Sequence, residues 1–219
     1  MASDTIMVIV AHADDQVLGF GGSLAKYIVE GKTVVTVVFS YSERSAPHYK
    51  NDIIRERTIE ESRAADKVLG GSGVTFLGLR SGHLEEDFRK NGAQSALRDL
   101  LLKHMPSKIF THAIDDSLSD HKAVNRLLLG VYDDLKNERR LSSDVYGFGI
   151  WRLFRFKRRH SPRLVVDVSD TFSKKLRAID VFKSQRPRLF ILKIGVYVNA
   201  LLRGLKHGAV FVEEFQKLR

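Results

Sequence analysis

The stretch "IMVIVAHADDQVLGFGG", residues 6–22, decides the fold of this chain. An apolar, β-branched run at 6–10 leads into a histidine, two adjacent carboxylates and a glycine cluster. Such a run is typical of a buried strand, and the apolar spacing over 22–30 is helical. A second apolar run, VVTVVF at 34–39, follows. These segments predict a β-α-β unit in which His12, Asp14 and Asp15 stand where the first strand ends.

The alternation of strands and helices continues along the chain. We expect helices over 51–69, 92–104 and 121–136, and strands over 74–79, 108–113, 144–151 and 164–168. Strands separated by helices predict a mostly parallel sheet with helices on both faces. No internal repeat or low-complexity linker interrupts the pattern, and 219 residues suit one large domain. The expected fold is therefore α/β, a single three-layer Rossmann-like domain over residues 1–219.

Composition limits which side chains can bind a metal ion or act as a nucleophile. The chain contains no cysteine, which excludes disulfides, thiolate metal sites and a cysteine nucleophile. Any metal ligands must therefore be His, Asp or Glu. The N-terminal residues lack the basic region and cleavage site of a signal peptide, and no apolar run is long enough to span a membrane. We therefore expect a cytoplasmic protein.

The charge balance suggests an anionic partner. The formal net charge is +10, and the most basic segment is RLFRFKRRHSPR at 152–163. A phosphorylated small molecule, an acidic membrane surface and nucleic acid would all suit this charge. The segment interleaves aromatic and basic residues as single-strand binders do, yet a charge run on a loop is usually only solvated. We therefore expect no nucleic-acid partner.

A second polar cluster, HAIDDSLSDH at 112–121, begins where another predicted strand ends. Ligands of parallel sheets bind outside the carboxyl ends of the strands, so the two clusters are expected to meet. The first supplies His12 and the second His121, each with carboxylates, which is the donor set of a zinc site with two histidines and one carboxylate. An aspartate could instead cap a helix, and the glycines could form a tight turn. The glycines at 19, 21 and 22 do not match a dinucleotide-binding loop.

These motifs resemble a known family. AHADDQVLGFGGSLA is similar to the A-H-P-D-D-E…G-G signature of the LmbE-like, PIG-L-type N-acetylglucosaminyl de-N-acetylases. The resemblance extends in chain order to the helix from Glu60 to Gly70, to DDSLSDHKAV, to VVDVSDTFSKKLRAIDVFKSQ and to the closing VFVEEF. It therefore covers nearly the whole chain.

The resemblance implies a zinc-dependent hydrolase that removes acetyl from an N-acetylglucosamine-type sugar or its conjugate. Carried over residue by residue, it implies zinc bound by His12, Asp15 and His121, with another divalent metal as the alternative. Asp14 would be the general base on the attacking water. Asp120 would hold an imidazole or the base in place.

The chain departs from the family pattern at three positions. Ala13 replaces a proline and Gln16 a glutamate, both outside the implied ligand set. Leu118 stands where most members carry a histidine, sometimes an asparagine, that hydrogen-bonds the tetrahedral intermediate, and losing such a donor costs on the order of 10²–10³ in turnover. The alternative is therefore a metal- or sugar-binding member with reduced or lost turnover. His112 or Arg57 would compensate as substrate-binding residues.

Partners and the C-terminal segment leave alternatives open. The expected partner is an acetylated amino-sugar conjugate, and an anionic group on it would suit the charge. Arg57 is equally explained as a surface arginine paired with Glu61 at i+4. The apolar residues at 189–202 favour a buried helix that covers the sheet over an interfacial helix that contacts anionic lipids. A homo-oligomer is also left open.

Overall fold

The computed structural model describes residues 4–41, 51–150 and 163–219. Its centre is a seven-stranded sheet of order β3-β2-β1-β4-β5-β7-β6. The first five strands in this order are parallel, and β7 pairs antiparallel with both β5 and β6. The strands are β1 (Thr5–Val10), β2 (Thr33–Ser40), β3 (Val74–Leu79), β4 (Lys108–His112), β5 (Asp144–Phe148), β6 (Arg163–Asp167) and β7 (Val212–Lys217). The predicted α/β class with a mostly parallel sheet is confirmed.

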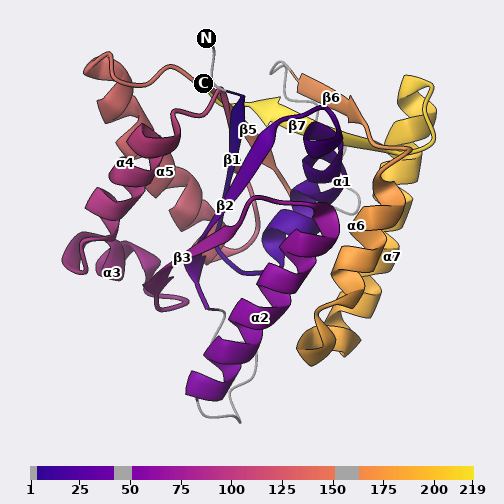
Figure 1. The fold of residues 1–219 in the computed structure, drawn as a ribbon, viewed down its shortest axis with the longest axis horizontal. Helices are drawn as coiled ribbons and strands as arrows, with labels where there is room; N and C mark the ends of the chain where they lie inside the picture. The colour runs from indigo at the N-terminus through magenta and orange to yellow at the C-terminus, as the bar shows by residue number, and fades with distance from the viewer. Residues whose placement is uncertain (1–3, 42–50, 151–162) are drawn as a thin grey trace.

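Helices cover both faces of the sheet. They are α1 (Asp15–Val29), α2 (Asn51–Leu69), α3 (Leu84–Lys90), α4 (Ala93–His104), α5 (Ser119–Asn137), α6 (Phe172–Asp180) and α7 (Arg186–His207), with a short 3₁₀ helix at Lys183–Gln185. Figure 1 shows α3, α4 and α5 on one side and α1, α2 and α6 on the other, with α7 outermost. Two separate hydrophobic clusters fill these two interfaces. The layers thus follow from the alternating pattern of the sequence.

Two α-helices and one strand were not predicted: α3, α6 and β7. Helix α3 has only seven residues, too few for a clear helical period. Strand β7, VEEFQK, has two adjacent glutamates where an apolar run or a strict alternation would mark a strand. Strand β5 also ends at Phe148 rather than at 151. The basic segment at 152–162 lies outside the described residues.

Helix α1 begins at Asp15, seven residues earlier than the apolar spacing predicts. The glycines at 19, 21 and 22 therefore lie inside a helix, and their interpretation as a tight turn is wrong. A Cβ atom at Gly19 would lie 2.2 Å from Cδ2 of Phe148, and one at Gly22 would lie 3.0 Å from Oε1 of Glu213. The glycines let the helix approach the sheet closely, and this packing outweighs their poor helix propensity.

Glu213 of β7 ties α1 to the far edge of the sheet. Its buried carboxylate accepts hydrogen bonds from the backbone N–H groups of Gly22 (3.1 Å) and Ser23 (2.8 Å). The Nζ of Lys175, on α6, lies 2.5 Å from the same carboxylate. Because each buried charge is paired and hydrogen-bonded, the pair is tolerated in the interior. It helps to hold the helix whose N-terminus carries the aspartates of the opening motif.

Two glycine substitutions test the close approach of α1. Gly19→Ala is expected to lower the free energy of unfolding by about 1–3 kcal/mol, because the added methyl group overlaps the buried ring of Phe148. The matched control is Gly130→Ala on α5, where a Cβ meets nothing within 4 Å. That variant is expected to gain about 0.5–1 kcal/mol from helix propensity. Urea denaturation measures both; equal effects at the two positions would contradict the packing argument.

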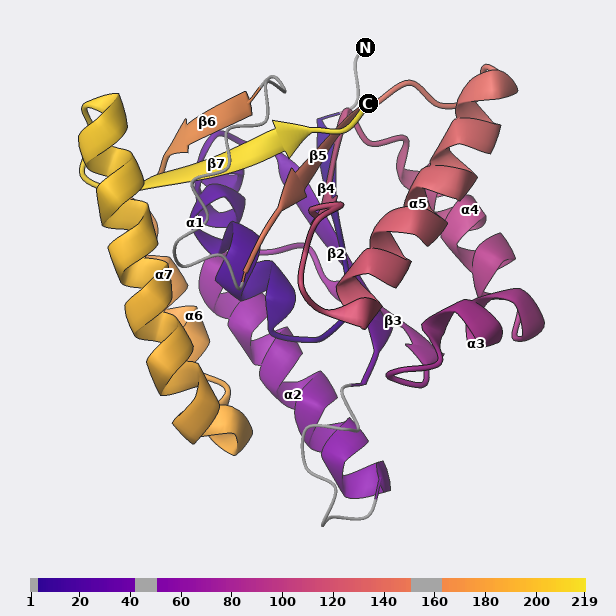
Figure 2. The same ribbon diagram turned by 180° about the vertical axis from the view of Figure 1, so that it is seen from behind.

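Helix α7 is only half buried, which corrects the expectation of a buried helix that covers the sheet. Leu189, Leu192 and Ala200 face inward and are at most 5% exposed, whereas Phe190 and Ile191 are 68% exposed. Figure 2, from behind, shows α7 at the outer edge of the molecule, beside α6 rather than over the sheet. Among the described residues, no helix is long and apolar enough to cross a membrane.

Candidate active site

The candidate site lies at the carboxyl ends of β1 and β4, which are neighbours in the sheet. Strands β2 and β4 both pair with β1 and lie on opposite sides of it, so the chain leaves this edge in two directions. His12 follows β1, Asp15 opens α1, and His112 ends β4. Asp120 and His121 stand in the first turn of α5. Residues about 100 positions apart in the chain are thereby brought together.

The imidazoles of His12 and His121 converge on one carboxylate, and Nε2 of the buried His112 also lies 3.3 Å from Oδ2 of Asp15. The Oδ2 of Asp15 lies 3.3 Å from Nδ1 of His12 and 3.3 Å from Nε2 of His121. The three donor atoms lie within 4.8 Å of one another, so one metal ion could contact all three. The backbone N–H of His12 also donates to Oδ2 of Asp15 at 2.8 Å, which holds the carboxylate in this orientation.

The second nitrogen of each imidazole faces another carboxylate. Nε2 of His12 lies 3.2 Å from Oδ2 of Asp120, and Nδ1 of His121 lies 3.0 Å from Oδ1 of Asp116. Asp120 in turn accepts a hydrogen bond from Oγ of Ser81 (2.8 Å). Carboxylates in this position orient the histidines of metal sites and make them more basic. The arrangement therefore leaves Nδ1 of His12 and Nε2 of His121 directed at Asp15.

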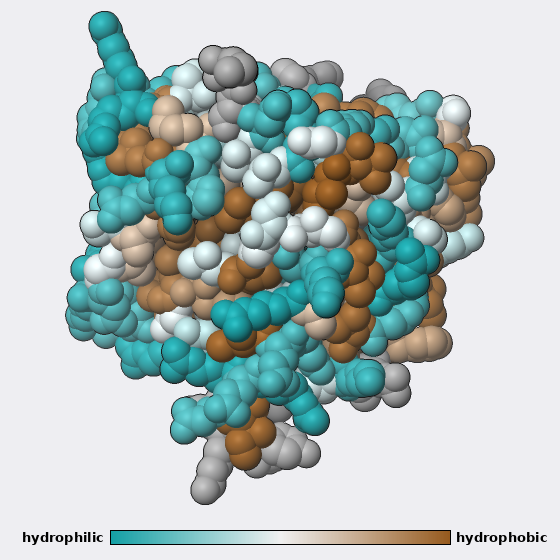
Figure 3. Space-filling model, viewed as in Figure 1, coloured by the Kyte–Doolittle hydropathy of each residue, from teal (hydrophilic) through white to brown (hydrophobic). Residues whose placement is uncertain are grey.

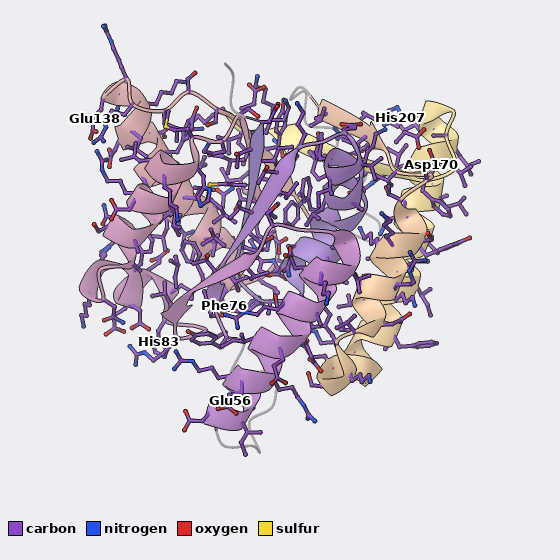
Figure 4. The ribbon with its side chains drawn as sticks, viewed as in Figure 1. Glu56, Phe76, His83, Glu138, Asp170 and His207 are labelled. Carbon is purple, nitrogen blue, oxygen red and sulfur yellow. The ribbon has the colours of Figure 1, made fainter. Side chains whose placement is uncertain are left out.

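The residues after β3 were not expected at the site. The carboxylate of Asp120 is held by Oγ of Ser81 and by the backbone N–H of Gly82, which lies 3.0 Å from Oδ1 of Asp120. Figure 4 labels Phe76 on β3 and His83, which lies between β3 and α3. The stretch Ser81–Gly82–His83 has no pattern of its own in the sequence. Only the pairing of β3 with β2 brings it to the same edge of the sheet.

His112 lies behind the cluster rather than at its surface. Its side chain is 0% exposed, and its ring stacks on that of His121 with centroids 3.8 Å apart. Its Nε2 accepts a hydrogen bond from the backbone N–H of Ala11 at 3.0 Å, so the neutral ring carries its proton on Nδ1. Burial lowers the pKa of His112 to about 4, which keeps the ring neutral.

The pKa values of the two converging histidines, His12 and His121, are raised rather than lowered. Burial disfavours the protonated ring of His12, but the carboxylates of Asp15 and Asp120 outweigh burial and raise its pKa to about 10. In the same way, Asp15 and Asp116 outweigh burial at His121 and raise its pKa to about 9. Without a metal ion, both rings are therefore in the doubly protonated, positively charged form at neutral pH. A cation that binds between them would replace those protons.

The adjacent aspartates differ in electrostatics. Burial, followed by the charge of Asp15, raises the pKa of Asp14, while the guanidinium of Arg188 opposes that rise. Burial also opposes ionisation of Asp15, yet the three surrounding imidazoles outweigh it and hold its pKa well below its usual range. Asp15 is therefore the permanent anion of the pair. Asp14 is the one placed to take up a proton.

Asp14 is 2% exposed, and its Oδ2 has no hydrogen-bond partner among the described residues. The nearest cation is Arg188 at the start of α7, whose Nη2 lies 3.9 Å from that oxygen. Sequence reasoning missed Arg188, because nothing local in the sequence relates the start of α7 to a motif more than 170 residues earlier. A free buried oxygen beside the converging histidines is available to a ligand.

The structure does not bring Arg57 into this cluster. Its side chain is exposed on α2 and forms no hydrogen bond or ion pair with the described residues of the site. Glu61, the alternative partner of Arg57, instead accepts hydrogen bonds from the backbone N–H (2.9 Å) and Oγ (2.5 Å) of Ser184. Leu118 is half-buried at the N-cap of α5 and belongs to neither hydrophobic cluster of the described chain.

Sequence comparisons relate the chain to known deacetylases. The model of the family described as PIG-L, GlcNAc-PI de-N-acetylase, matches residues 7–132. The protein named "uncharacterized deacetylase YaiS" of Escherichia coli K12 is 33% identical over 126 residues, which are 54% of this chain. The match spans 63% of the E. coli protein, less than two thirds of its length.

Solved structures show the same fold at low identity. The 4-carboxy-2-hydroxymuconate hydratase GalB of Pseudomonas putida KT2440 has a TM-score of 0.84 and 21% identity, with 98% of this chain and 96% of GalB covered. The N,N'-diacetylchitobiose deacetylase of Pyrococcus horikoshii has a TM-score of 0.80 and 21% identity, with 99% and 84% covered. A deacetylase of teicoplanin biosynthesis has a TM-score of 0.77 and 17% identity, with 97% of each chain covered.

Proposed function

This chain belongs to the GlcNAc-PI de-N-acetylase (PIG-L) family, and from that premise we propose that it is a metal-dependent N-deacetylase of an N-acetylglucosamine-type sugar or its conjugate. The fold alone does not select this reaction, because a hydratase shares it. The family match and the E. coli deacetylase favour hydrolysis of an acetamide. The net charge of +10 favours a conjugate that carries an anionic group.

The observation that carries the proposal is the pairing of each converging imidazole with its own carboxylate. His12, Asp15 and His121 would hold a divalent ion, with zinc as the first choice, because two imidazoles and one carboxylate are typical zinc donors. Nε2 of His121 has no hydrogen bond among the described residues, which leaves it available to an ion. When bound, zinc would polarise the acetamide carbonyl and lower the pKa of water.

Asp14 would move the proton. Its free Oδ2 would accept a proton from the attacking water and return it to the amide nitrogen as the C–N bond breaks, which yields acetate and a free amine. The raised pKa of Asp14 suits this exchange, and the charge of Arg188 opposes part of that rise. Asp120 and His112 would act as positioning residues through their contacts with His12 and His121.

The test of this function is metal analysis combined with acetate release from N-acetylhexosamine conjugates, with and without an anionic group. We expect about one ion per chain and acetate release that stops when a chelator removes the ion. A chain that keeps its metal and releases no acetate from any conjugate would favour the binding protein without turnover. The deacetylase relatives favour turnover.

Leu118 offers a more specific test, because leucine cannot stabilise an oxyanion. Leu118→His would restore a donor at the start of α5 and is expected to raise kcat about tenfold or more, with a smaller change in KM. Leu118→Met, which adds no donor, is the control. A Leu118→His chain that is several kcal/mol less stable and no faster would show that the leucine is structural.

A further inference from the structure

The outward face of α7 is an unbroken apolar strip. At spacings of one to four residues, side chains that are at least 36% exposed follow the whole helix. We call this surface the α7 stripe; it consists of Phe190, Ile191, Ile194, Tyr197, Val198, Leu202 and Leu205. At 1.5 Å per residue, the 22-residue helix is roughly 33 Å long. Figure 3 shows hydrophobic side chains among hydrophilic ones at the right-hand edge, where α6 and α7 lie.

An apolar groove joins the α7 stripe on the side of α6. Its volume is about 810 Å³, and Phe190, Ile194 and Tyr197 belong both to its lining and to the stripe. The other apolar lining residues are Leu176, Ile179, Phe182 and Leu189. Asp180 and Lys193 also line the groove and form an ion pair of 2.6 Å. A flexible hydrocarbon chain would fit such a groove, whereas a polar ligand would find few partners.

The helix pair also concentrates the positive charge of the chain. Residues 172–207 contain nine Lys or Arg and one Asp, a net charge of +8 against +10 for the whole chain. Helix α7 itself has no acidic residue. Lys175 pairs with Glu213, and Lys206 with Glu214, both from β7. With these two glutamates counted as well, the sum of formal charges for this segment is +6.

We propose that the α7 stripe docks the protein on an anionic membrane surface. Helices that lie in the membrane interface combine an apolar face with basic residues, and anionic lipids attract the basic residues. A second copy of the chain is the poorer occupant, because two α7 stripes in contact would bring two positive surfaces together. Arg188, whose Nη2 lies 3.9 Å from Oδ2 of Asp14, belongs to the same helix as the α7 stripe. The docking does not depend on the proposed reaction.

The experiment is co-sedimentation of the full chain with phosphatidylcholine vesicles that contain or lack phosphatidylglycerol. We expect binding to the anionic vesicles at low salt and none to the neutral ones. Release is expected in 1 M salt, where the Debye length falls to about 3 Å. No binding to anionic vesicles at low salt overturns the proposal.

Matched variants locate the contact. Ile191→Asp and Leu205→Asp, at 68% and 72% exposure, are each expected to weaken binding about tenfold or more. Val29→Asp, at 69% exposure on α1, adds the same charge outside the α7 stripe and is expected to bind almost as the wild type does. Circular dichroism identifies the variants that fold, and either stripe variant suffices. Equal losses in Val29→Asp and the stripe variants, or a solution dimer that Ile191→Asp separates, overturn the proposal.

Discussion

Replacement of Asp14 by asparagine is expected to leave zinc binding near one ion per chain while acetate release falls by at least about two orders of magnitude. The substitution removes the group that would take and return the proton, but it touches none of the three converging donor atoms of His12, Asp15 and His121. Zinc content by mass spectrometry and kcat by acetate release are measured on the same preparation.

The control for this variant is Asp170→Asn. Figure 4 labels Asp170 near His207, which ends α7, whereas Arg188 lies in the first turn of that helix. This control removes the same charge from the chain and is expected to change neither quantity. Asp15→Asn is the informative counterpart, because it is expected to lose zinc and activity together. If Asp14→Asn loses zinc while Asp15→Asn keeps it, the proposed roles of the two aspartates are reversed.

His121→Ala is expected to abolish both zinc binding and acetate release. The imidazole supplies one of three donors and stacks on His112, so its removal leaves two donors and a void in the site. His207→Ala, at the far end of α7, is the matched control and is expected to keep its zinc. If His121→Ala binds zinc as tightly as the wild type does, His121 is not a ligand.

The partner carboxylate predicts a graded effect. Asp116→Asn should weaken zinc binding by about 10–100-fold rather than abolish it, because Asp116 orients His121 without replacing it.

Zinc affinity should also rise with pH. The raised pKa values of about 10 for His12 and about 9 for His121 mean that binding must displace their protons. Competition with a chromophoric chelator at several pH values measures this; an affinity independent of pH would contradict it.

Much of the fold could be predicted from local pattern. The apolar runs at 6–10 and 34–39 and the helical spacing between them are properties of adjacent residues, so they predict strands and a helix without reference to the rest of the chain. The rule that parallel strands gather ligands at their carboxyl ends then predicts that His12 and His121 approach each other. The assignment of residues 1–219 to one domain stays a prediction, as do the roles of the site residues.

Other features of the site depend on contacts that no local pattern contains. Helix α1 starts at Asp15 because the glycines of the motif pack against Phe148 and Glu213, which lie far away in the sequence. The partner of each histidine is likewise decided by packing. Asp120 reaches His12 across 108 residues, while Asp116, from the same motif, lies 3.0 Å from Nδ1 of His121.

By itself, then, the sequence determined the α/β class, the two strand ends that carry polar residues and the absence of thiolate chemistry, because periodicity and composition are local. The tertiary structure alone decided which carboxylate supports which imidazole, the approach of Arg188 to Asp14 and the exposure of one face of α7. These are long-range properties. They depend on which surfaces remain after the sheet and its helices have packed, and the amphipathic pattern of α7 is the same whether its outer face meets protein, water or lipid.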